Sequence, residues 1–317
     1  MNEKQNAVQS QAGKIIAQMR KVIVGKDQTL LWVLVTILSK GHILLEDIPG
    51  VGKTTMAVAL SKVLGLSYNR VQFTPDVLPS DVTGYSVLDS ATGAMRYQPG
   101  AVLCNLFLAD ELNRATSRTQ SALLEAMEEG QVTVDGVAHK LPQPFIVIAT
   151  QNPTGAAGTQ LLPDSQMDRF AIRMSIGYPG ASDEIAMVMN RQKGNPMTEL
   201  EPVLTKEAFL AVQDLVAQTY IGETVVQYVV NLIQATRRNG KILRGASPRA
   251  TLAVVAMAKA FACLQGRDYV IPRDVQEVFQ KTVAHRLLLT PQAEGSGITP
   301  AAVLGEILAQ VPAPQLR

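Results

Sequence analysis

Short apolar runs alternate with helical patterns over the first half of the chain. The apolar runs lie at residues 42–45, 70–73, 106–109, 145–149 and 172–176. Between most of them, apolar residues recur at helical spacing, as at 53–63 and 117–127. Short, continuously apolar runs are typical of strands that are buried on both faces of a parallel sheet. Their alternation with helices predicts an open α/β fold around a parallel sheet.

Two strand pairs interrupt this plan. Residues 85–88 and 95–98 flank the segment 89–94, and residues 132–134 and 137–139 flank Asp135-Gly136, a strong signal for a two-residue turn. Hairpins do not extend a parallel sheet, so we expect both to protrude from it. Such protrusions are either functional insertions or surface decoration without function.

The start of the chain and its second half have helical patterns. Residues 12–19 and the segment after Asp27 are amphipathic, and Val22–Gly25 between them is predicted as a short extended segment that ends in a turn. After Gly180 the strand signal disappears, and helical patterns occupy residues 183–192, 206–219, 225–238, 250–264, 273–285 and 301–310. The pattern predicts an α/β core over residues 1–190 and a helical domain over residues 191–317.

Length, composition and charge narrow the class of protein. The 317 residues suffice for about two domains. A net charge of +2 leaves no basic excess to neutralise the phosphates of a nucleic acid, so no nucleic-acid partner is expected. Cys104 and Cys263 lie in apolar runs without metal-ligand spacing, and we expect both to be buried, reduced thiols.

The sequence indicates neither secretion nor a membrane span. The polar N-terminus does not have the basic and then apolar pattern of a secretory signal. The longest apolar stretch, residues 250–264, contains Lys259 and is shorter than the ~20 residues that a membrane-spanning helix needs. We therefore expect a cytoplasmic protein.

The segment Gly50-Val51-Gly52-Lys53-Thr54-Thr55 lies between a predicted strand and a predicted helix. Glycines let backbone N–H groups approach phosphate oxygens, and the N-terminus of the helix adds positive potential. Lys53 is placed to reach the β- and γ-phosphates of a nucleotide, and the Thr54 hydroxyl to ligate Mg²⁺. The strict phosphate-loop pattern has a glycine where this chain has Asp47; aspartate tolerates turn geometry better than most residues, so the loop can still form.

Polar residues follow two further predicted strands. Asp110 and Glu111 end the run 106–109, where adjacent acids are costly unless they bind cations or position water. Asp110 suits a hold on Mg²⁺, and Glu111 suits polarisation of an attacking water. Asn152, after the run 145–149, is either a turn residue or a group that orients the same water. Arg169 and Arg249 either form surface ion pairs or stabilise the charge that develops in phosphoryl transfer.

These pieces, in this order, resemble the AAA+ superfamily and, within it, the MoxR family. The resemblance is carried by LLEDIPGVGKTT, RVQFTPDVLPSDVTGY, YQPGAVLCNLFLADELNRATSRTQSALLEAMEEGQVTVDG, IATQNP, LPDSQMDRF, GASPRA and VAHRL. It spans residues 44–287, and the long stretch from Tyr97 to Gly136 is far more specific than a phosphate loop alone. The resemblance implies an AAA+ P-loop αβα core with a parallel sheet, followed by an all-helical lid domain.

The resemblance also implies a role for each candidate residue. It assigns nucleotide binding to Val24 and Gly25 near the adenine and to Pro49, Gly50, Val51, Gly52, Lys53, Thr54 and Thr55 around Walker A, and Mg²⁺ to Thr54 and Asp110. Glu111 resembles the catalytic acid of Walker B, Asn152 sensor 1, Arg169 the arginine finger that reaches a neighbour's ATP, and Arg249 sensor 2 on the lid. The first hairpin resembles the helix-2 insert and the second the pre-sensor-1 insertion, which point toward a central pore. The role of Arg114 stays open.

The implied activity is Mg²⁺-dependent hydrolysis of ATP by a homo-oligomeric ring, expected to be a hexamer. MoxR-like proteins assist assembly or cofactor insertion in partner complexes, so the resemblance implies a client protein complex and a partner with a von Willebrand A domain. The alternative is a nucleic-acid-dependent motor, because related ATPases with the same inserts translocate DNA. The near-neutral charge and the short tail after residue 290 favour the first hypothesis. A scaffold that only binds nucleotide would have no need of Glu111.

Overall fold

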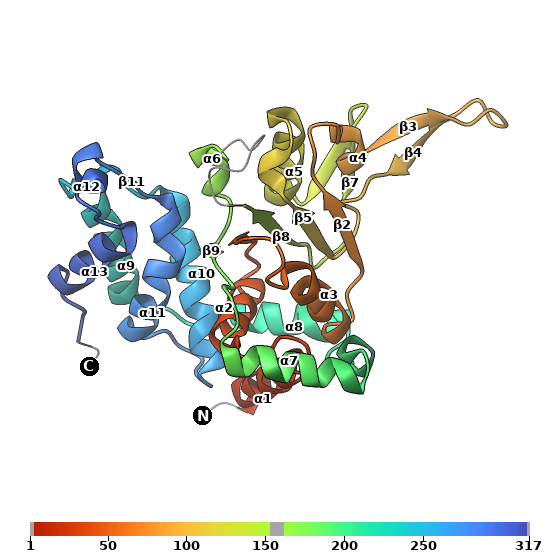
Figure 1. The fold of residues 1–317 in the computed structure, drawn as a ribbon. Helices are drawn as coiled ribbons and strands as arrows, with labels where there is room; N and C mark the ends of the chain where they lie inside the picture. The colour runs from red at the N-terminus through yellow and green to blue at the C-terminus, as the bar shows by residue number, and fades with distance from the viewer. Residues whose placement is uncertain (1–2, 153–161, 316–317) are drawn as a thin grey trace.

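A five-stranded parallel sheet forms the centre of the molecule (Figure 1). The computed structural model describes residues 3–152 and 162–315. Across the sheet the strands are ordered β2 (Tyr68–Gln72), β5 (Leu106–Asp110), β8 (Ile146–Gln151), β1 (Ile43–Glu46) and β9 (Ile172–Met174). All neighbouring pairs are parallel. The predicted α/β class and the five predicted strands are thus confirmed.

Successive residues of the strands enter two hydrophobic cores on opposite faces of the sheet. Leu106 and Leu108 belong to the first core, and Phe107 and Ala109 belong to the second. The first core also takes residues from α1 (Glu3–Arg20), α2 (Asp27–Leu38) and α3 (Lys53–Val63). The second is covered by α4 (Pro79–Thr83) and α5 (Ser117–Glu129). Burial on both faces explains why these strands read as continuous apolar runs rather than as alternating ones.

Both predicted hairpins are present and both leave the sheet. The first consists of β3 (Gly84–Leu88) and β4 (Met95–Pro99), and it projects far from the body of the molecule (Figure 1). The second consists of β6 (Gln131–Val134) and β7 (Val137–Lys140). The rings of Tyr97 and His139 stack between the two hairpins, with 3.7 Å between their centroids. The hairpins are therefore in contact with each other.

The second half of the chain is mainly helical, as predicted. Its helices are α6 (Asp164–Met167), α7 (Ala181–Lys193), α8 (Lys206–Ala217), α9 (Glu223–Arg238), α10 (Pro248–Leu264), α11 (Pro272–Val283), α12 (Pro291–Gly295) and α13 (Pro300–Gln310). Two very short strands, β10 (Ile242–Arg244) and β11 (Leu288–Leu289), pair antiparallel among them. The hydrophobic pattern did not predict this pair, because strands this short have no readable period. The proposed domain boundary at residue 190 falls inside α7.

The C-terminal helices pack directly on the N-terminal ones. Residues of α8 to α11 share the first core with α1 and α2. Trp32 of α2 stacks on Phe261 of α10, with 5.7 Å between ring centroids, and the Lys281 ammonium of α11 lies 5.6 Å from the centroid of the Trp32 ring. The helical part is therefore anchored to the sheet through α1 and α2.

The segment Val22–Gly25 differs from its prediction. We expected an extended segment, but the chain turns here between α1 and α2, and Gly25 has a φ of +71°. A Cβ at Gly25 would overlap the carboxylate of Asp183 at the start of α7. The apolar run Val22-Ile23-Val24 serves packing rather than strand pairing, since Ile23 is buried in the first core.

None of the helices in the described part of the chain is long and apolar enough to cross a membrane.

Candidate functional site

The loop between β1 and α3 has the backbone geometry of a phosphate loop. Gly50 and Gly52 have φ values of +88° and +97°, which residues with a side chain rarely adopt. Helix α3 begins at Lys53, so its N-terminal amides and their positive potential lie next to the loop. Thr54 and Thr55 follow in the first turn and are half-buried, whereas Pro49 at the start of the loop is exposed.

Lys53 lies inside this loop. Its Nζ donates to the carbonyl oxygens of Asp47 and Ile48, at 2.7 and 3.3 Å. Burial lowers the pKa of Lys53, and the negative charges of Asp47, Asp110 and Glu111 raise it again. The ammonium is therefore in electrostatic contact with Asp110 and Glu111 at the end of β5, which the sequence analysis had placed at the same nucleotide as the loop.

Asp110 and Glu111 end β5, and Thr150 of the neighbouring strand β8 connects them. The Thr150 hydroxyl donates to Asp110 Oδ1 at 2.6 Å and accepts from the Glu111 backbone N–H at 2.8 Å. Glu111 has a left-handed backbone, with a φ of +56°, which is uncommon for a residue with a side chain. Asn152 Nδ2, just beyond β8, lies 3.4 Å from Glu111 Oε1. Pro153, which follows it, lies outside the described residues.

Two arginines neutralise this acid pair. Arg70 Nη2 of β2 lies 2.7 Å from Asp110 Oδ2, and Arg114 Nη1 lies 2.8 Å from Glu111 Oε2. Arg114 was noted in the sequence without a role, and Arg70 was not recognised at all. Nothing in the order of the elements along the chain shows that β2 lies beside β5, so the partner of Asp110 could not be found from the sequence.

A pocket of 490 Å³ opens beside the phosphate loop. Its wall includes Val24, Gly50, Gly52, Thr55, Ile176 and Tyr178. A largely apolar pocket next to phosphate-binding groups has the character of a site for a flat base. Of the two residues expected near the adenine, Val24 lines the pocket, while Gly25 forms the adjoining turn.

Asp47 connects the phosphate loop to the wall of this pocket. Its buried carboxylate accepts hydrogen bonds from Ser175 Oγ, at 2.6 Å, and from the backbone N–H groups of Ile176 and Gly177, at 2.6 and 3.1 Å. The side chain at this position, where the strict pattern has a glycine, thus has a structural partner after the end of β9.

Arg169 and Arg249 lie together, beside a different pocket. Both guanidinium groups form ion pairs with Glu128 of α5, and Arg169 Nη1 also donates to the Leu124 carbonyl oxygen at 2.5 Å. A pocket of 320 Å³ has these three charged side chains in its wall. Among the residues that the structure describes, no hydrogen bond or ion pair joins either arginine to Lys53, Asp110 or Glu111. One subunit therefore presents two separate groups of candidate residues.

Magnesium fits the residues present. The Thr54 hydroxyl and the Asp110 carboxylate are oxygen donors, which Mg²⁺ prefers, and Mg²⁺ is usually held by few protein groups together with phosphates and water. Both Asp110 oxygens already accept hydrogen bonds from Thr150 and Arg70, which suits contact with a metal-bound water. No cluster of three or more His, Cys, Asp or Glu side chains that could hold a metal alone occurs within residues 3–152 and 162–315.

Comparisons with known proteins agree with this geometry. Residues 42–172 match the family model for the ATPase family associated with various cellular activities (AAA), and residues 234–307 match the AAA lid domain. The chain is 45% identical to the uncharacterized protein YeaC of Bacillus subtilis, over 96% of this chain and 95% of the relative. It is 38% identical to the chaperone MoxR1 of Mycobacterium tuberculosis, over 96% and 82% of the two chains. The crystal structure of a Cytophaga hutchinsonii protein assigned as an ATPase superposes with a TM-score of 0.90 at 34% identity, covering 99% of this chain and 98% of that one.

Proposed function

Because the chain belongs to the MoxR family of AAA+ ATPases, we propose that it hydrolyses ATP in a ring of identical subunits to remodel or mature partner protein complexes. ATP hydrolysis itself follows from the family. One observation supports the ring most directly. The phosphate loop and the acids of β5 lie together, whereas Arg169 and Arg249 pair with Glu128 beside another pocket. A site that needs Arg169 or Arg249 in addition to Arg70 and Arg114 is thus incomplete within one subunit.

In this proposal each residue of the first group has one task. Lys53 leaves its carbonyl partners and neutralises the β- and γ-phosphates, and the left-handed glycines keep the loop backbone accessible to them. Glu111 accepts the proton of the attacking water, and Asn152 holds the Glu111 carboxylate in place. Bound Mg²⁺ supplies positive charge to the phosphates, with Thr54 and Asp110 as its protein groups. The apolar pocket at Val24 and Ile176 takes the adenine.

Arg169 and Arg249 act on the neighbouring subunit in this proposal. A guanidinium that reaches a transferring phosphoryl group is worth about 10³–10⁵ in rate. Such an arrangement links hydrolysis to assembly and gives a heterologous interface, which forms a ring when the rotation between subunits closes. We propose a hexamer in the cytoplasm.

Mixed rings test the trans arrangement. An Arg169→Ala subunit keeps Glu111, and a Glu111→Gln subunit keeps Arg169. Each variant alone should turn over slowly, since general-base catalysis is worth about 10²–10⁴ and the finger about 10³–10⁵. Mixing them should restore part of the turnover, because some interfaces then combine an intact Glu111 with an intact Arg169. Mixtures that stay inactive, although labelled subunits are seen to exchange, would contradict the proposal.

The remodelling activity is proposed from the family and from the exposed hairpin. Leu88 and Met95 near the tip of β3–β4 are 66% and 64% exposed, which suits contact with a client protein. We propose that the client is a protein complex and that a von Willebrand A domain protein assists. A Glu111→Gln ring that is loaded with ATP should retain both during affinity purification, and a Lys53→Ala ring should not. Several-fold stimulation of hydrolysis by DNA at ~150 mM salt would instead favour a nucleic-acid motor.

A further inference from the structure

Arg286 is a buried cation, and most of its hydrogen bonds go to residues 168–171, far away in the chain. It lies in the 3₁₀ turn Ala284–Arg286 after α11, and its side chain is 3% exposed. Nε donates to Asp168 Oδ1 at 2.8 Å, and Nη2 donates to the carbonyl oxygens of Asp168 and Phe170, at 3.0 and 2.7 Å. Burial lowers the pKa of Arg286 and the charge of Asp168 opposes this, as expected for a buried cation that needs its partner.

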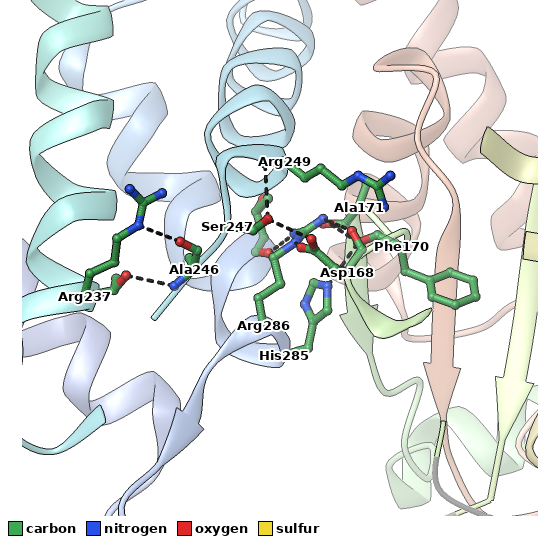
Figure 2. A network of polar contacts seen from close by, with 11 residues as sticks. Asp168, Phe170, Ala171, Arg237, Ala246, Ser247, Arg249, His285 and Arg286 are labelled. Carbon is green, nitrogen blue, oxygen red and sulfur yellow. Dashed lines mark hydrogen bonds and ion pairs between the residues drawn. The ribbon is translucent and has the colours of Figure 1, made fainter. Parts of the chain in front are cut away.

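The second oxygen of Asp168 connects this segment to α10. Ser247 Oγ donates to Asp168 Oδ2 at 2.7 Å, and Ser247 Oγ also accepts a hydrogen bond from the backbone N–H of Arg249 at 3.1 Å. Ser247 is the N-cap of α10. Figure 2 shows Ser247 at the start of α10 and Arg286 both reaching the Asp168 carboxylate. One carboxylate thus fixes two segments of the helical part to the end of α6.

Both candidate arginines lie close in the chain to residues of this network. Arg169 directly follows Asp168, and Arg249 lies two residues after Ser247. Their side chains meet at Glu128. The sequence motif that contains Arg286, VAHRL, was part of the family resemblance but had no role in the proposed chemistry.

We propose that Asp168, Ser247 and Arg286 are positioning residues that hold Arg169 and Arg249 as one fixed pair for the neighbour's ATP. This inference rests on the proposed function, in which the two arginines act in trans. Catalytic groups contribute most when they are held in place before the reaction, and a displacement of about 1 Å can cost as much as 10²-fold in rate. The Asp168 carboxylate supplies that constraint across the join between the sheet and the helical part.

The test places the substitution in a subunit whose own site is inactive. Glu111→Gln subunits are mixed with Arg169→Ala subunits, so that all recovered turnover uses the arginines of the Glu111→Gln partner. Adding Ser247→Ala to the Glu111→Gln subunit should lower the recovered turnover about ten-fold. Ser247→Thr, which keeps the hydroxyl, should restore it. Because Ser247→Ala also removes a helix cap, Thr205→Ala, which removes the cap of α8 far from Asp168, serves as the control and should leave turnover unchanged.

The outcomes separate the two proposals. If the parent mixture recovers no turnover, the trans arrangement itself is wrong. If the parent mixture recovers and Ser247→Ala changes nothing, or if Ser247→Ala and Thr205→Ala lower turnover equally, Ser247 does not position the arginines. A second readout is the effect of Ser247→Ala on wild-type and Arg249→Ala rings. The loss should be smaller in the second, where only Arg169 is left to be positioned, whereas a general loss of stability would lower both rings by the same factor.

Discussion

At the scale of single residues, the role of Asp47 depends on contacts outside the phosphate-loop motif. The sequence names Lys53, Asp110 and Glu111 as candidate residues, and the structure brings these charges together. The sequence could not explain Asp47, because the hydrogen-bond partners of Asp47, residues 175–177, lie 128 to 130 positions later in the chain, after the last strand of the sheet. Arg70, Thr150 and Glu128 were missed for the same reason: each acts through a neighbour that only the folded chain supplies.

Replacing Asp47 by glycine would restore the strict phosphate-loop pattern and yet should weaken nucleotide binding. The change removes three hydrogen bonds to a carboxylate and releases Ile176 from the wall of the pocket. Hydrogen bonds to charged groups are worth ~1.5–3 kcal/mol each, so a loss of about ten-fold or more in affinity is expected. Isothermal titration with ADP measures it, with Asp89→Gly in the outer hairpin as the control. Equal or tighter binding would show that the tether has no part in the pocket.

His42 gives the fold a defined acid sensitivity. Burial lowers its pKa to about 4, and its Nδ1 accepts the Val147 backbone N–H at 3.0 Å, so the ring is neutral in the folded state. An unfolded chain protonates it near pH 6.5. Because the unfolded chain takes up this proton before the folded one does, the free energy of unfolding is unaffected above pH 6.5 and falls by about 3 kcal/mol in all as the pH drops toward 4. Burial, and the nearby charge of Arg286, also lower the pKa of His285, with the same sign.

Urea unfolding at several pH values measures this dependence. The free energy of unfolding should fall between pH 6.5 and 4, and His42→Gln should show a shallower fall. His139→Gln, in the half-buried hairpin position, should keep the wild-type slope. An identical slope in the His42 and His139 variants would mean that another group is responsible.

At the scale of elements, the spacing of hydrophobic residues predicted the long helices and the buried strands, but it was less informative about segments of only a few residues. Each strand of the sheet is an apolar run because both of its faces are covered. Residues 22–25 had the same composition and form a turn, since their apolar side chains fill a core without a strand to pair with. The contact between the two hairpins could not be read from a pattern, because Tyr97 and His139 are brought together only by the folding of α4 and α5 between the sheet and the hairpins.

The Tyr97–His139 stack should make the two hairpins move together. Aromatic pairs contribute about 0.5–1.5 kcal/mol beyond their buried area. His139→Ala should therefore increase amide exchange not only in β6–β7 but also in β3–β4. Val137→Ala, on the same hairpin and 57% exposed, should affect only its own strand pair. Hydrogen-exchange mass spectrometry resolves the two hairpins, and unchanged exchange in β3–β4 would show that they are independent.

At the scale of the whole molecule, the fold places Lys53 with Asp110 and Glu111, and places Arg169 and Arg249 together beside a different pocket. The α/β class and the helical second half were predicted from the sequence, and the ring is an expectation from the family resemblance. What the sequence could not provide is the placement of α10, which carries Arg249 in its first turn and packs on α2 and α1 through the first core. That packing depends on Trp32, Phe261 and their neighbours, which look like ordinary core residues in the sequence.

Specific ATPase activity should rise with protein concentration, because in the proposed arrangement Arg169 and Arg249 reach a site only from a neighbouring subunit. The measurement is turnover over a dilution series, with the mass of the assembly followed by light scattering in parallel. Arg249→Ala should lower the plateau while leaving the concentration of half-maximal activity nearly unchanged, if assembly depends mainly on other contacts. Full turnover from a confirmed monomer would contradict the arrangement.

Trp32 can serve as an intrinsic fluorescence probe. It is the only tryptophan of the chain, and it is enclosed by Phe261 of α10 and the ammonium of Lys281 on α11. Ultraviolet excitation at 295 nm would therefore report from the join between α2 and the C-terminal helices without any added dye. If ATP turnover slides α10 over α2, the emission maximum and its quenching by acrylamide will change in step with hydrolysis. If the emission maximum and the quenching stay constant while ATP is consumed, each subunit moves as a rigid body, and the conformational change occurs between subunits rather than within them.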